Sequence, residues 1–123
     1  MKFEELLSKL GSKSIESTKE RFIDDKSFYV EITEELLVDP GFNQLKVEID
    51  NKNKEQAFEV SHMLKGVIAN CGLTPLYETS AKIVDILRKD NPNFYMLQNL
   101  YQELLERRDF AKKIIDGECE HDK

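Results

Sequence analysis

The stretch of residues 57–73 constrains the fold of this chain most, because its apolar residues recur only with the period of a helix. At about 100° per residue, side chains spaced three and four apart fall on one side of a helix. The residues on that side are Ala57, Val60, Leu64, Ile68 and Cys71. His62 lies almost diametrically opposite. The pattern therefore predicts a helix that buries one face and holds a histidine in water on the other.

The outer side of this predicted helix carries a glycine one turn after the histidine. Gly66 costs about 1 kcal/mol relative to alanine in a helix interior, so its presence suggests that another molecule must come close there. The other residues on or beside this outer side are Glu55, Phe58, Glu59, Lys65 and Ala69. The sequence thus places charged, aromatic and small residues around one exposed imidazole.

Helical periodicity also runs through the rest of the chain, and no strand-like alternation accompanies it. Four long helices are predicted, over residues 26–50, 53–71, 75–89 and 93–115, the first of them bent at Pro40. Short breaks separate them, with helix-start signals at Asn53, Thr74-Pro75 and Asn91-Pro92. Long amphipathic helices joined by short connections predict an all-α fold, an antiparallel up-down four-helix bundle with additional short N-terminal helices.

A chain of 123 residues fits one domain with a substantial core. We expect residues 1–24 to cap one end or side, residues 26–115 to form the bundle, and residues 118–123 to be a disordered tail. The tyrosines at 29, 77, 95 and 101 are expected at the edge of the core.

Charge and composition narrow the classes of partner. A net charge of −6 argues against nucleic acid, whose binding depends on Lys and Arg neutralising phosphates. No apolar run approaches the roughly 20 residues that cross a bilayer, and two early acidic residues argue against a secretory signal. Cys71 and Cys119 do not have the spacing of a disulfide framework or a metal cluster. A cytoplasmic monomer is the expectation.

His62-Met63-Leu64-Lys65-Gly66, followed by Asn70-Cys71-Gly72-Leu73, resembles the signature of histidine-containing phosphotransfer (HPt) domains. Met63 replaces the small polar residue that often follows the histidine in that family. The resemblance implies that His62 is phosphorylated, that Lys65 is the cation beside the phosphate, and that Gly66 is the gap that admits a partner. HPt domains are four-helix bundles with an exposed histidine in mid-helix, which agrees with the predicted fold.

The chemistry of these residues fits that role. An imidazole with the ordinary pKa of about 6.5 is mostly unprotonated near neutral pH and is a nucleophile toward phosphorus. The chain has no ATP-binding motif, no glycine-rich phosphate loop and no acidic cluster suited to Mg²⁺ around His62. It is therefore expected to be a phosphocarrier rather than an enzyme, without a cofactor of its own. In the family, the receiver domain of a response regulator supplies the aspartate and Mg²⁺, and a hybrid sensor histidine kinase can be the donor.

Further residues are assigned to partner docking, to phosphate contact and to the end of the helix. The expected docking patch for the partner consists of Phe58 and Ala69, with Glu55, Glu59 and Lys65 at its margin. Arg88, on the following helix, is a candidate for reaching the phosphate. Asn70 is expected to be a helix-end or packing residue rather than a phosphate ligand.

Alternatives remain open at this point. An exposed histidine outside such a motif is usually plain surface. The chain could dock a receiver or kinase without carrying phosphate, or be the direct substrate of a histidine kinase core acting in trans. A metal-dependent helical enzyme is remote, because the one Glu-x-x-His pair, Glu59 and His62, faces outward. A Cys119-His121 metal site is equally remote.

Overall fold

The computed structural model describes residues 1–121, with side chains to residue 118, and this part of the chain contains helices and no strand. Its helices are α1 (Phe3–Lys9), α2 (Ile15–Arg21), α3 (Lys26–Leu37), α4 (Gly41–Asp50), α5 (Lys54–Asn70), α6 (Thr74–Leu87) and α7 (Phe94–His121). The prediction of an all-α chain is confirmed.

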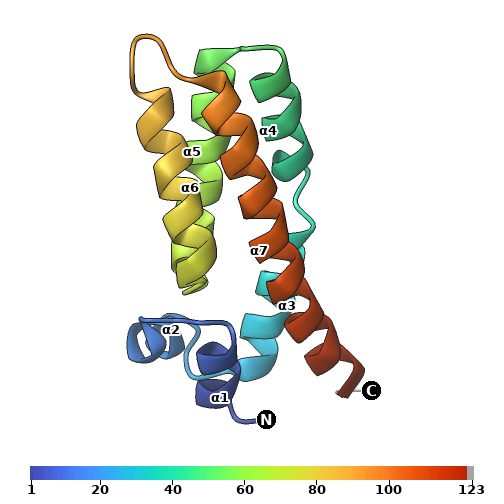
Figure 1. Cartoon of the computed structure of the whole chain (residues 1–123). Coiled ribbons are helices and arrows are strands. Elements are labelled where there is room, and N and C mark those ends of the chain that lie inside the picture. Colours follow the sequence, from blue (N-terminus) through green and yellow to red (C-terminus); the bar gives the residue numbers. More distant parts are fainter. Residues whose placement is uncertain (122–123) are drawn as a thin grey trace.

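The last four helices, α4 to α7, lie side by side, and each runs opposite to the one before it (Figure 1). α4 packs against α5, α5 against α6 and α6 against α7, while α7 also contacts α4 and α3. These contacts enclose a core of Leu, Ile, Val, Phe and Tyr side chains. The pair α1 and α2 lies beneath the lower end of α5 and α6 in Figure 1, so the N-terminal helices sit against the turn that ends the histidine-bearing helix.

The chain breaks at Pro40, where the sequence predicted a single bent helix over residues 26–50. α3 ends at Leu37 and α4 begins at Gly41. Proline lacks the N–H that a continuing helix needs, and its ring crowds the preceding turn. The Asp39 carboxylate then accepts a hydrogen bond from the Gly41 N–H at 2.6 Å. The prediction of one bent helix is therefore wrong, and two separate helices, α3 and α4, occupy residues 26–50.

The C-terminal helix continues further than predicted. α7 reaches His121, whereas a helix ending at 115 and a disordered tail over 118–123 were expected. The Glu118 side chain is buried and its carboxylate lies 2.7 Å from the Lys26 ammonium. That ammonium also donates to the Met1 carbonyl at 2.6 Å. The start of α3 thus holds the last turns of α7 in place, and only residues 122 and 123 of the expected tail lie outside the described residues.

Two tyrosines expected at the edge of the core lie inside it. Tyr29 and Tyr101 are almost fully buried. Each hydroxyl donates to a distant backbone carbonyl at 2.7 Å, Tyr29 to Cys71 and Tyr101 to Phe42. Burial raises the pKa of both phenols. Because each phenol finds an acceptor, a polar group can be buried here without leaving its hydrogen bond unmade.

Tyr29 is expected to make the stability of the protein sensitive to alkali. Its pKa is raised by burial in the folded chain, so above pH about 10 the unfolded chain loses this proton while the folded chain keeps it. The free energy of unfolding should fall with rising pH more steeply for the wild type than for Tyr29→Phe. The variant itself should lose about 1–3 kcal/mol at neutral pH, because the Cys71 carbonyl loses its donor.

Chemical denaturation at pH 7 to 11 measures both effects, with Tyr95→Phe as control because Tyr95 is 74% exposed. If the free energy of unfolding of the wild type and of Tyr29→Phe changes with pH in parallel, Tyr29 is not the cause of the alkaline loss of stability.

Candidate functional site

The helix α5 presents His62 to solvent because its opposite face is held in the core. Ala57, Leu64 and Ile68 are completely or almost completely buried, while His62 and Gly66 are exposed. The helical-wheel prediction for this stretch is confirmed. Asn53, one of the predicted helix-start signals, occupies the N-cap position of α5, although its side chain makes no capping hydrogen bond.

The C-terminal end of α5 is fixed by the N-terminal helices. Gly72 has φ +66°, a left-handed conformation that favours glycine, and an added Cβ would collide with the Thr18 hydroxyl. Arg21 donates to the Asn70 carbonyl at 2.8 Å. Asn70 is the last residue of α5, and this bond uses its backbone, in keeping with the helix-end role predicted for it.

His62 and the residues predicted beside it make a ring stack and two cation–aromatic contacts with the next helix. The Phe58 ring stacks on His62, with ring centroids 5.6 Å apart and planes at 25°. The Arg88 guanidinium lies 5.8 Å from the centroid of the Phe58 ring. The half-buried Lys65, also on α5, places its ammonium 5.8 Å from the centre of the Tyr77 ring of α6. Arg88 is thus connected to His62 through Phe58.

Gly66 stands at an open place on the surface. Among the residues that the structure describes, no heavy atom lies within 4 Å of the position that a Cβ would occupy, leaving out the neighbouring backbone of its own helix. Gly72 and Gly11 differ, since a Cβ on either would meet a neighbouring side chain. Packing within the chain therefore gives no reason for glycine at position 66.

Two grooves flank this face of α5. One, of about 380 Å³, is lined by Lys54, Glu55, Phe58, Glu59, Leu87 and Arg88. The other, of about 260 Å³, is lined by Lys13, Ser14, Ala69, Gly72, Leu73, Thr74 and Tyr77. The first brings together four of the residues predicted for the site. Phe58 and Ala69 line different grooves, eleven residues and roughly 16 Å apart along the helix, so the structure does not join them into one patch.

The second groove is lined in part by the N-terminal segment, which the sequence did not predict to lie there. Lys13 lies in the connection between α1 and α2, and its backbone N–H donates to the Thr74 hydroxyl at 2.9 Å. Thr74 is 61 residues from Lys13 in the sequence, and both line this groove together with Ala69. No local pattern around Lys13 indicates such a position.

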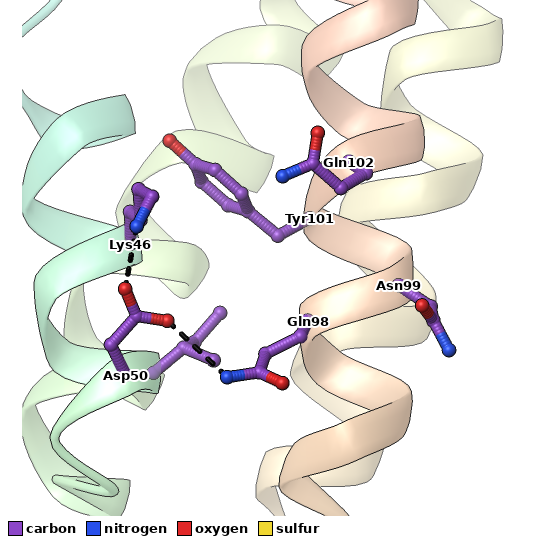
Figure 2. A pocket seen from close by; sticks show the side chains of 7 residues that line it. Lys46, Asp50, Gln98, Asn99, Tyr101 and Gln102 are labelled. Carbon is purple, nitrogen blue, oxygen red and sulfur yellow. Dashed lines mark hydrogen bonds and ion pairs between the residues drawn. The ribbon is translucent and has the colours of Figure 1, made fainter.

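A third groove, of about 290 Å³, lies between α4 and α7 (Figure 2), and the residues that line it include none of α5. Its charged groups are paired with each other: Lys46 lies 2.6 Å from the Asp50 carboxylate, which also accepts from Gln98 at 3.4 Å. The hydrogen bond from Lys46 holds the pKa of Asp50 below its usual value. With its charges already neutralised, this groove offers no candidate for the chemistry predicted here.

Among the described residues, no group of three or more His, Cys, Asp and Glu side chains is placed to hold a metal ion. The Cys119 and His121 side chains, named above as a remote metal pair, lie outside the described side chains. In the same part of the chain, no helix has both the length and the apolar character that crossing a membrane requires.

Comparison with known proteins identifies no relative: no family model, no curated protein and no solved structure matches the chain.

Proposed function

We propose that this chain is a phosphocarrier of the HPt kind, in which His62 accepts a phosphoryl group from a receiver aspartate and passes it to another. The observation that carries the proposal is the exposed imidazole of His62 on the outer face of α5, with Lys65 one turn on and open space at Gly66. These three residues stand in the order of the His-x-Leu-Lys-Gly signature.

The packing supports the same proposal. In our interpretation α4, α5, α6 and α7 form the antiparallel four-helix bundle, with α3 extending it along α7 and with α1 and α2 as additional N-terminal helices. The mutual contacts of these helices bury the inner face of α5 and leave its outer face uncovered within the described chain. A rigid helix is a suitable support for a nucleophile that a partner must reach.

The proposed step exchanges one phosphorus bond for another. An unprotonated imidazole nitrogen attacks the phosphorus of the receiver's aspartyl phosphate. The N–P bond forms while the P–O bond breaks, and the bonding pair leaves with the aspartate carboxylate. The imidazole keeps the proton on its other nitrogen, and the reverse step delivers the phosphoryl group to the next receiver. Positioning and Mg²⁺ for this transfer come from the receiver.

Lys65 is the group of this chain that can stabilise the phosphoryl oxygens. Its ammonium is a compact charge on a flexible side chain, and the contact with Tyr77 leaves it unpaired with any carboxylate among the described residues. We expect Lys65→Gln to slow transfer from a phosphorylated receiver by about tenfold or more. Lys65→Arg should recover part of the rate. Lys113→Gln serves as control, because Lys113 is an exposed lysine on α7 and lines neither groove beside α5. Equal rates for Lys65→Gln and the wild type would contradict the role of Lys65.

The test of the proposal uses the purified chain, a receiver domain phosphorylated on its aspartate, and Mg²⁺. Intact mass should show an added phosphoryl group on the chain, and the linkage should be labile in acid and stable in alkali, as expected of phosphohistidine. A second, unphosphorylated receiver should then remove it.

The alternatives give different results in this experiment and in a parallel incubation of the chain with a histidine kinase core and ATP. Binding of several receivers without transfer would overturn the phosphocarrier and favour a docking module. Label that appears only with a histidine kinase core and ATP, and never with a receiver, would favour a direct kinase substrate. The absence of binding and of label would overturn all three readings.

A further inference from the structure

The imidazole of His62 is exposed but does not stand alone on the surface, because it stacks against the Phe58 ring. The two rings are stacked, with centroids 5.6 Å apart. Side chains on a helix lean toward its N-terminus, so a residue reaches the one four positions earlier. Phe58 is half-buried and packs against the core, whereas His62 is exposed. The phenylalanine is therefore the fixed member of the pair and the histidine the movable one.

Phe58 is itself covered from the next helix. The Arg88 guanidinium lies over the Phe58 ring, 5.8 Å from its centroid. Arg88 is the C-cap residue of α6, and it has no ion pair or hydrogen bond to another side chain within the described residues. Both residues line the same groove, together with Leu87. The recorded partner of this cation is thus an aromatic ring rather than a carboxylate.

The stack restricts the imidazole without blocking its chemistry. The lone pair of an imidazole nitrogen lies in the plane of the ring. A ring covered on one face keeps both nitrogens accessible at its edges, while rotation of the side chain is limited. Orienting a nucleophile in this way lowers the entropy that must be lost at the transition state.

We propose that Phe58 is the positioning residue of His62, and that Arg88 acts by holding the Phe58 ring in place. This inference rests on the proposed phosphocarrier function. It replaces the sequence-based assignment of Phe58 to a docking patch and of Arg88 to the phosphate. Under this proposal, neither Phe58 nor Arg88 contacts the phosphorus.

A small phosphoryl donor separates positioning from docking. With phosphoramidate, the imidazole N–P bond forms, the donor's own P–N bond breaks, and the donor nitrogen leaves as ammonia. No protein partner takes part, so an effect on this rate cannot come from partner docking. We expect Phe58→Leu to slow phosphorylation of His62 by about three- to tenfold. Phe94→Leu is the matched control, since Phe94 is another half-buried phenylalanine packed against the core.

Proton NMR gives a readout that needs no phosphoryl transfer. The chain contains two histidines, so the imidazole signals of His62 are assigned by comparison with His62→Gln. Protons held against the face of an aromatic ring are shifted upfield. The His62 signals should therefore move downfield in Phe58→Leu and, by a smaller amount, in Arg88→Gln. They should stay in place in Phe94→Leu.

A double-mutant cycle tests how Arg88 acts. Arg88→Gln should slow the phosphoramidate reaction in the wild-type background and have no further effect in Phe58→Leu. Additive losses would overturn the indirect role of Arg88, and unmoved His62 signals in Phe58→Leu would overturn the positioning role of Phe58. If the wild type accepts no phosphoryl group from any donor while the signals do move, the stack exists but the proposed function, and with it the positioning role, is overturned.

Discussion

Replacing His62 with glutamine is expected to abolish phosphorylation of the chain by a phosphorylated receiver, while leaving its fold unchanged. Glutamine is close to histidine in size and favours helices, but its amide nitrogen is not a nucleophile toward phosphorus. His62 is exposed, and the stacked Phe58 ring is its recorded side-chain contact. The free energy of unfolding should therefore change by no more than about 0.5 kcal/mol. Intact mass after incubation with the phosphorylated receiver measures the loss of label.

The second histidine provides the control for this result. The sequence contains two histidines, His62 and His121. We expect His121→Gln to be labelled to the same extent as the wild type. Label that persists in His62→Gln and disappears in His121→Gln would move the phosphorylation site to the end of α7. Label that persists in both variants would mean that the phosphoryl group is carried by another kind of residue. Either result contradicts the role proposed for His62.

The part of the site that could be predicted is the part that lies within one helix. The apolar period of α5 places Leu64 inside and His62 outside, and no tertiary contact is needed to infer this. The glycine at position 66 is likewise visible in the sequence as an unfavourable residue for a helix interior. The structure adds that nothing packs against it.

The features that were missed depend on contacts between residues far apart in the chain. Burial of Tyr101 requires a carbonyl acceptor 59 residues away, and Lys13 meets the α5–α6 turn through Thr74. The extension of α7 depends on Lys26 at the start of α3 pairing with Glu118. Local periodicity carries no information on which distant group will satisfy a hydroxyl or a carboxylate.

The position of Arg88 shows the same limit at the site itself. The sequence places a cation on the helix after His62, and a cation near a phosphorylated residue suggests a phosphate ligand. In the structure its guanidinium lies over the Phe58 ring instead. The helix register needed to distinguish these two positions depends on how α6 packs against α5, which the sequence pattern does not specify.

Replacing Gly66 with glutamine is expected to give a protein that is more stable and yet nearly inactive with a receiver. No neighbour lies within 4 Å of an added Cβ, so the fold can accept a side chain there, and the gain in helix propensity is about 0.5–1 kcal/mol. A side chain one turn after His62 would, however, keep a partner's active site from closing over the imidazole. A misplacement of about 1 Å between reacting groups can cost about a hundredfold in rate. We therefore expect transfer from a phosphorylated receiver to fall by about that factor.

Gly117 provides the control for the general effect of replacing a helical glycine. It too lies within a helix, α7, and no atom of the described side chains lies within 4 Å of an added Cβ. Gly117→Gln should raise stability in the same direction and leave transfer at the wild-type rate.

The phosphoramidate reaction adds the second comparison, because a small donor needs far less room. Gly66→Gln should retain most of the wild-type rate with phosphoramidate while losing the reaction with the receiver. If Gly66→Gln accepts phosphoryl groups from the receiver as fast as the wild type, then the open surface at Gly66 does not serve partner access. If it loses both reactions equally, the side chain disturbs His62 itself, and the role of the glycine is to leave the imidazole free rather than to admit a protein.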